Sequence, residues 1–84
     1  MKLSGRLIKD TKVVREAFFV SRMNSSFRDA LEECLIGICR ELDIQVPLWL
    51  KKNTNEIVFY RKTSFFKDQF VEKVNFDRFE ITIE

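Results

Sequence analysis

The sequence predicts an α+β fold, in which an antiparallel sheet is built from an N-terminal β-hairpin and a C-terminal strand. One long amphipathic helix packs on one face of this sheet. The first 22 residues are two β-prone runs around a short polar turn. Residues 26–42 carry apolar side chains at helical spacing. The last six residues alternate between apolar and polar side chains, which is typical of a half-buried strand.

The hairpin is predicted from residues 2–10 and 12–22, which are joined by Asp10-Thr11-Lys12. Asp-Thr is not a preferred pair for a tight primed turn, so a three-residue or bulged loop is expected. The second arm is apolar on both faces in its second half. This is typical of a central strand, or of a strand that uses one face for a partner. The apolar residues of this arm are Val13, Val14, Ala17, Phe18, Phe19 and Val20.

Gly5 lies inside the first arm. A glycine within a strand marks a bulge or a place where another element comes close to the backbone. The C-terminal strand, with Phe79, Ile81 and Ile83 on one face, is expected to pair with this hairpin.

The helix over residues 26–42 is preceded by Ser25 and Ser26, which are good N-caps, and it is ended by Asp43 and Pro47. Its apolar side chains repeat every three or four residues, so they form one stripe. The stripe consists of Phe27, Ala30, Leu31, Cys34, Leu35, Ile38 and Leu42. Ile36 lies opposite the stripe and does not fit it.

Beyond this helix the local signals conflict. Asn53-x-x-Glu56 indicates the start of a short helix, predicted over residues 54–61, although the run 57–60 is β-prone. Residues 63–71 are compatible with an irregular strand or with a turn of helix. No internal repeat or domain boundary interrupts the chain, and a single domain over residues 1–84 is expected.

Composition excludes several functions. Histidine is absent, which excludes a catalytic triad with histidine, a histidine-ligated metal site and a histidine general base. The net charge of +2 is small for a protein that binds a phosphate backbone. No glycine-rich phosphate loop and no metal-ligand motif is present. No catalytic, cofactor-binding or metal-binding residue is therefore predicted, and the chain is expected not to be an enzyme.

The small net charge is the sum of four blocks. Six basic and two acidic groups give residues 1–22 a charge of +4, and two basic and five acidic groups give residues 23–50 a charge of −3. Five basic groups and one acidic group give residues 51–67 a charge of +4, and residues 68–84 carry −3. Oppositely charged neighbours on adjacent strands stabilise a sheet. The alternation therefore predicts that the C-terminal strand pairs with the N-terminal hairpin.

Cys34 and Cys39 lie on the predicted helix, five residues apart. This spacing separates their side chains by ~140° around the axis, so a disulfide between them is not expected. Cys34 is predicted to be a buried thiol and Cys39 a flanking one. An intermolecular disulfide or a reactive thiol at Cys39 is the alternative. Free thiols indicate a reducing compartment, and the N-terminus carries no apolar leader, so a cytoplasmic location without membrane spans is expected.

The most suggestive surface feature is the segment 49–67, where aromatic and basic residues interleave. Its candidate partner-binding residues are Trp49, Lys51, Lys52, Phe59, Tyr60, Arg61, Lys62, Phe65, Phe66 and Lys67. Aromatics among cations stack bases and contact phosphates in single-stranded nucleic-acid sites. The same residues suit a protein contact, with Trp49 as an anchor. Core aromatics with solvated Lys and Arg between them are the more common explanation of such a pattern.

Several short motifs make the whole chain similar to a family of short bacterial proteins of about this length. The motifs are Met1-Lys2-Leu3-Ser4-Gly5 with Ile8-Lys9-Asp10, Pro47-x-Trp49-Leu50-x-Lys52-Asn53, Lys62-Thr63-x-Phe65-x-x-Asp68-x-Phe70-Val71-Glu72 and Phe76-Asp77-x-x-Glu80-Ile81. None of them is a catalytic signature. The resemblance implies a free-standing native bacterial protein and no particular activity.

These observations favour a non-enzymatic protein-interaction or structural module that self-associates as a homodimer, through a sheet edge or the second sheet face. A single-stranded nucleic-acid-binding module using residues 49–67 is the alternative. A small enzyme or small-molecule binder is the third hypothesis, and it requires a deep pocket lined by convergent polar groups. No cofactor is expected in any of the three.

Overall fold

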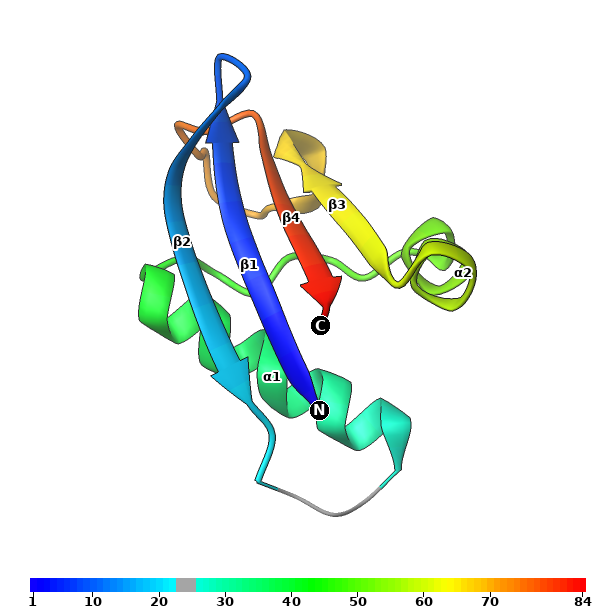
Figure 1. Cartoon of the computed structure of the whole chain (residues 1–84). Coiled ribbons are helices and arrows are strands. Elements are labelled where there is room, and N and C mark those ends of the chain that lie inside the picture. Colours follow the sequence, from blue (N-terminus) through cyan, green and yellow to red (C-terminus); the bar gives the residue numbers. More distant parts are fainter. Residues whose placement is uncertain (23–25) are drawn as a thin grey trace.

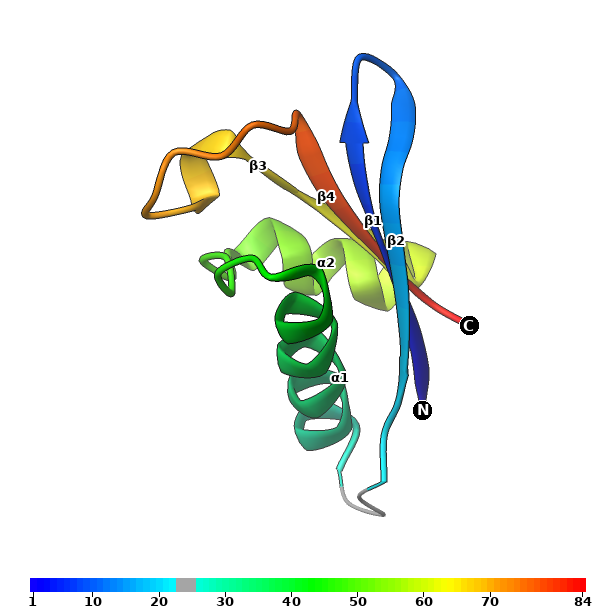
Figure 2. The ribbon, with the colours of Figure 1, turned by 90° about the vertical axis from the view of Figure 1, so that its left-hand side faces the viewer.

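The computed structural model describes residues 1–22 and 26–84 and shows an α+β fold with a four-stranded antiparallel sheet. The strands lie in the order β2-β1-β4-β3. Helix α1 covers one face of this sheet, and α2 lies beside β3 (Figure 1). The view from the side shows the sheet and α1 as two layers (Figure 2). The elements are β1 (Lys2–Lys9), β2 (Lys12–Val20), α1 (Phe27–Leu42), α2 (Lys51–Tyr60), β3 (Lys62–Phe66), the 3-10 turn η1 (Lys67–Gln69) and β4 (Arg78–Ile83).

The predicted pairing of the C-terminal strand with the hairpin is confirmed, because β4 pairs antiparallel with β1. Leu3 lies opposite Ile83, and Leu7 lies opposite Phe79, so apolar residues of both strands share the face that α1 covers. On the other face Arg6 lies opposite Glu80 and forms a 2.6 Å ion pair with Glu16. Arg6 of the first basic block therefore lies opposite Glu80 of the last acidic block, as the charge blocks predict, whereas the ion pair with Glu16 lies within the first block.

The interpretation of the second arm as a central strand is wrong, because β2 lies at an edge of the sheet. β1 and β4 take the two central places, since their alternating apolar residues bury one shared face. The face of β2 turned away from the helix layer remains in solvent. Its exposed apolar residues are Val13, Val14, Phe18 and Val20.

The hairpin turn is tighter than the sequence predicts. Asp10 and Thr11 both have positive φ, at 52° and 66°, so they form a two-residue turn. The irregularity lies one step into the strands, where Val14 is the extra residue of a bulge. The carboxylate of Asp77 accepts a 2.8 Å hydrogen bond from the Asp10 N–H. This tertiary contact from the start of the β4 segment holds a turn that Asp-Thr does not itself prefer.

Helix α1 begins and ends close to the predicted bounds. The hydroxyl of Ser26 accepts a 3.2 Å hydrogen bond from the Asp29 N–H, and Asp43 ends the helix with a φ of 56°. Ser25, the other predicted cap, lies outside the described residues. The apolar stripe faces the sheet, with one exception, because Phe27 is 52% exposed. Ile36 is exposed, as its place outside the stripe predicts.

Two glycines set how closely α1 approaches the sheet. A Cβ at Gly5 would lie 2.5 Å from the Ile38 side chain, and a Cβ at Gly37 would lie 2.3 Å from the Phe19 ring. The space that each glycine leaves is thus filled by a side chain from the opposite layer. The close approach predicted at Gly5 is confirmed, and a matching one exists at Gly37.

The second helix begins three residues earlier than predicted, at Lys51. Asn53 is not its cap but lies within the first turn, where its side-chain oxygen accepts a 3.0 Å hydrogen bond from the Leu50 N–H. The helix ends where Arg61 adopts a φ of 59°. Of residues 63–71, which the sequence leaves open between strand and helix, 63–66 belong to strand β3, which pairs with β4, and 67–69 form the 3-10 turn η1. Strand β3 is the second edge of the sheet.

A buried polar network joins α2, β3 and η1. The Asn53 side chain is fully buried and makes four hydrogen bonds, of which its amide nitrogen donates two, to the Thr63 hydroxyl at 2.7 Å and the Ser64 carbonyl at 3.1 Å. Its oxygen accepts one from the Gln69 amide at 3.0 Å and one from the Leu50 N–H. Gln69 also donates to the Leu48 carbonyl. Every polar atom of the Asn53 side chain is thus paired.

We expect Asn53→Ala to lower the free energy of unfolding by about 3 kcal/mol, because its buried partners lose their hydrogen bonds and gain no water. Urea unfolding followed by circular dichroism measures this loss. Asn55→Ala is the matched control, since Asn55 is an exposed asparagine on the same helix. A loss at Asn53 no larger than that at Asn55 would show that the network is not essential.

Candidate functional site

The structure divides the candidate segment 49–67 between core and surface. Phe65 is fully buried, with its ring 5.6 Å from that of Trp49 and 5.7 Å from that of Phe79. Its prediction as a partner-binding residue is therefore wrong, because the alternation of β3 turns it inward. Trp49 is half-buried, and its indole N–H donates a 2.8 Å hydrogen bond to the Thr54 hydroxyl. The other candidates are exposed: Lys51, Lys52, Phe59, Tyr60, Arg61, Lys62, Phe66 and Lys67.

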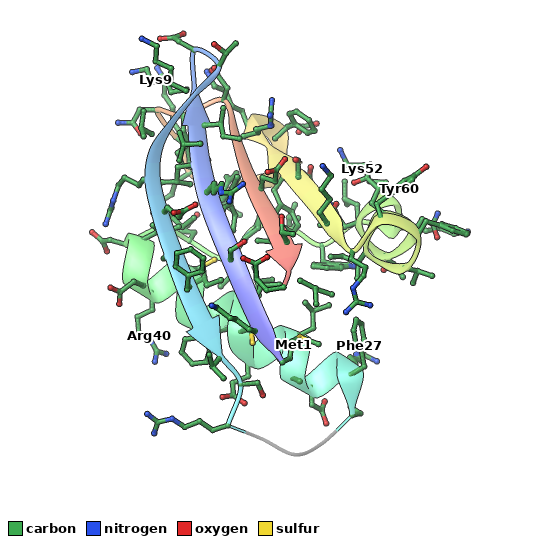
Figure 3. The ribbon with its side chains drawn as sticks, in the orientation of Figure 1. Met1, Lys9, Phe27, Arg40, Lys52 and Tyr60 are labelled. Carbon is green, nitrogen blue, oxygen red and sulfur yellow. The ribbon has the colours of Figure 1, made fainter. Side chains whose placement is uncertain are left out.

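The exposed candidates do not form one platform. Phe66 lies on the sheet face that carries no helix in the described structure, and the Lys52 ammonium stands 4.8 Å above its ring. Phe59 and Tyr60 instead project from α2. In Figure 3, Lys52 and Tyr60 lie on one side of α2, and Phe27, from the start of α1, lies on the other. The exposed candidates are thus spread over the outer sheet face at Phe66 and the surface of α2, with Lys52 between them.

The last turn of α2 exposes three consecutive large side chains, which spread over ~200° of the helix surface. Val58, Phe59 and Tyr60 are 65%, 76% and 70% exposed, and we call these three residues the α2 ridge. Only Asn53 and Ile57 of this helix are buried. The helix is therefore attached by a narrow inner side, and large apolar side chains cover its outer side. Val58 was not among the predicted residues, since its exposure depends on how α2 is seated.

A groove lies beside the ridge, between the start of α1 and α2, and it has a volume of about 510 Å³. Its walls are mostly apolar, with Arg28 and Glu32 as its charged members. We call it the α1–α2 groove, and its lining residues are Phe27, Arg28, Leu31, Glu32, Trp49, Thr54, Ile57 and Val58. Phe27 is exposed because it forms one wall of this groove. The sequence does not reveal the groove, because its two walls are distant along the chain.

The exposed edge strand β2 is a second apolar surface, but charges and a bulge interrupt it. The Lys2 ammonium lies 5.3 Å from the Phe18 ring centroid, and the Arg6–Glu16 ion pair lies next to it on the same face. The bulge at Val14 breaks the regular spacing of the edge. Bulges and charged side chains are the features by which natural edge strands avoid pairing with other chains.

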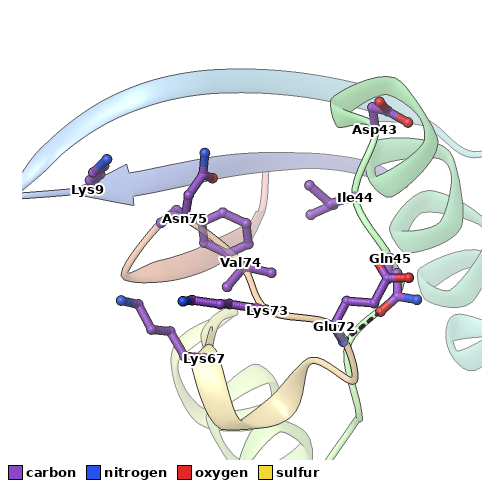
Figure 4. Close-up of a pocket in the computed structure, with 10 residues that line it drawn as sticks. Lys9, Asp43, Ile44, Gln45, Lys67, Glu72, Lys73, Val74 and Asn75 are labelled. Atoms are coloured by element: carbon purple, nitrogen blue, oxygen red, sulfur yellow. Dashed lines mark hydrogen bonds between the residues drawn. The ribbon is translucent and has the colours of Figure 1, made fainter.

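A second cavity, with a volume of about 920 Å³, lies where the hairpin, the loop before β4 and the end of α1 meet (Figure 4). Lys9, Lys67 and Lys73 lie toward one end, and Asp43 and Gln45 lie at the other. Lys67 is 3.9 Å from the Asp77 carboxylate. Volumes of ~300–1,000 Å³ are usual for small-molecule sites. The lining offers an anion a cationic end, and its side-chain oxygen groups are the carboxylates of Asp43 and Glu72 and the amides of Gln45 and Asn75.

Both cysteines are buried and free. The Cys34 thiol is within 3.8 Å of the carbonyl oxygens of Met1 and Phe19. Burial raises the pKa of the Cys39 thiol to about 12. The prediction of Cys39 as a flanking, reactive or disulfide-forming thiol is therefore wrong, because its side chain faces the core and its thiolate is disfavoured.

In the part of the chain that the structure describes, no three residues of the metal-binding types cluster closely enough to hold an ion. Neither described helix combines the length and the apolar character that crossing a membrane requires. Comparison of the chain with protein families, curated proteins and solved structures finds no match. The similarity to a family of short bacterial proteins stays a prediction, and the function is argued from the surfaces described above.

We expect Cys39 to resist alkylation in the folded protein at pH 8 and to react once the chain is unfolded. Since its pKa is raised from 9.0 to about 12, the folded state binds a proton that the unfolded state releases. The free energy of unfolding should therefore fall as the pH rises through this interval, by up to about 1.4 kcal/mol per pH unit from this thiol.

Mass spectrometry of iodoacetamide adducts and urea titrations between pH 8 and 11 measure both effects. The Cys39→Ala variant is the control, and its stability should fall less steeply with pH. Burial also raises the pKa of Cys34, so part of the slope remains in this variant. Rapid labelling of Cys39 in the folded wild type would contradict the expectation.

Proposed function

We propose that the protein is a non-enzymatic protein-interaction module that self-associates as a homodimer. The α2 ridge supports this proposal, because three consecutive large side chains stand 65–76% exposed on one helix. An aromatic side chain buries ~150–250 Å² when covered. The ridge therefore leaves on the order of 400 Å² of mainly apolar surface in water, which is within the range of the largest apolar patch of a monomer, a patch that is often functional.

The α2 ridge is a better interface than the β2 edge, which the sequence favours. Pairing along β2 would have to accommodate the bulge at Val14 and desolvate the Arg6–Glu16 pair. Covering the ridge buries Phe59 and Tyr60 without removing a charged side chain of the ridge itself from water. We also infer a cytoplasmic location, since two free buried thiols suit a reducing compartment.

We expect the chain to show a concentration-dependent mass between monomer and dimer in light scattering and sedimentation velocity. Replacing Phe59 and Tyr60 together by Ser should make it monomeric, because the interface loses its two largest apolar side chains. Val71→Ser is the matched control, since Val71 is 85% exposed but lies outside the ridge. A wild-type chain that stays monomeric at millimolar concentration would refute self-association.

A single-stranded nucleic-acid function is the second candidate, and the stacking of Lys52 on the exposed Phe66 ring favours it. Two of the predicted aromatics, Trp49 and Phe65, contribute to the core instead, which leaves few rings for bases. We therefore expect titration with labelled 16-nucleotide RNA and DNA at low salt to give flat anisotropy curves. Saturable binding that Phe66→Ala abolishes would support this second function over the first.

A further inference from the structure

The α2 ridge and the α1–α2 groove lie next to each other and share Val58. One holds projecting aromatic side chains, and the other is a mostly apolar hollow of about 510 Å³. A molecule with both a projection and a matching hollow on one side can exchange them with a second copy around a two-fold axis. In such a dimer, the ridge of each copy occupies the groove of the other. Neither copy then keeps a free ridge or groove that could bind a third copy.

We infer that the second copy of this chain docks by placing Phe59 of its α2 ridge into the α1–α2 groove, and that the exchange is reciprocal. This inference rests on the proposed self-association and specifies its interface. Phe59 is the most exposed aromatic residue among the described residues, at 76%, and the groove wall offers it Phe27, Leu31 and Trp49. Aromatic anchors in such pockets dominate the energy of protein interfaces.

The charges around the two features are complementary. Arg61 follows the ridge directly, and Lys51 lies at the other end of α2, whereas Asp29 and Glu32 lie on the first turns of α1. The groove wall itself carries one acidic residue, Glu32, and one basic residue, Arg28, so the acidic excess at the start of α1 comes from Asp29 beside them. When a ridge enters the groove of a second copy, a basic end of α2 meets the acidic start of α1. The charge of +4 over residues 51–67 is therefore complementary to the charge of −3 over residues 23–50 of the second copy.

The area buried in the proposed interface sets the affinity that we expect for the dimer. A stable complex usually buries ~800 Å² on each partner. The ridge supplies on the order of 400 Å² and the groove less than that, so the interface is smaller than that of a standard stable complex and belongs with weak, transient associations. We therefore expect a dissociation constant in the micromolar range.

The test is oxidative cross-linking between two different single-cysteine additions to the full chain. Protein with Arg61→Cys, which keeps the Phe59 anchor, is mixed with protein carrying Glu32→Cys, and mild oxidation should join the two species into a mixed disulfide dimer. Because each species carries only one added thiol, this bond can form only between copies. The control pairs Arg61→Cys with Val14→Cys on β2, which should not cross-link, and the native buried thiols are present in both.

A charge exchange tests the same contact without removing an apolar side chain. Glu32→Lys and Arg61→Glu should each weaken the homodimer roughly tenfold, because like charges then meet twice across the two-fold axis. An equimolar mixture of the two variants should recover the wild-type affinity, since each contact of the mixed dimer again joins opposite charges. A general loss of folding would not be repaired by mixing.

The outcomes separate this inference from the proposed function. If the wild type dimerises and the variants cross-link through Val14→Cys but not between Arg61→Cys and Glu32→Cys, the ridge-in-groove contact is overturned and self-association is kept. A chain that is monomeric throughout overturns both, even if its ridge binds a different protein. The mixed disulfide, together with recovery in the charge-exchanged mixture, supports both.

Discussion

The buried side chain of Asn53 is the interaction on which the second half of the molecule depends. All four of its hydrogen-bonding positions are used, and they bind the connector at Leu50, strand β3 and the turn residue Gln69. A half-satisfied buried amide is costly, so this set of partners permits only one arrangement of α2 against the sheet. Apolar contacts of α2 with the core are few, since Ile57 is its only buried apolar residue.

This mode of attachment explains why α2 exposes so much apolar surface. A helix held by polar contacts at its inner side does not need an apolar stripe, and its remaining large side chains face the solvent. The seating also leaves a groove between α2 and the start of α1, so the same network creates the ridge and the hollow beside it. The α2 ridge and the α1–α2 groove therefore both depend on the position that the hydrogen bonds of Asn53 give to α2.

The first half of the molecule is held differently, by close contact between layers. Gly37 admits the Phe19 ring, and Gly5 admits Ile38, so α1 and the sheet interlock. This part of the fold is readable from the sequence, because helical spacing and strand alternation each point to one buried face. The place of β2 at the edge was not readable, since apolar residues on both faces suit a central strand and an interaction strand equally well. β2 lies at the edge because β4 pairs with β1 on the side opposite to β2.

By itself the sequence determined the fold class, the bounds of α1 to within one residue, the pairing of β4 with the hairpin and the lack of histidine chemistry. These properties follow from local periodicity and composition. Tertiary structure alone decided the tight turn at Asp10 and Thr11, the inward direction of Phe65, the burial of Cys39 and the exposure of the α2 ridge. Each of these depends on a contact between residues far apart along the chain, such as Asp77 with Asp10 or Asn53 with Gln69, and no local pattern records such a contact.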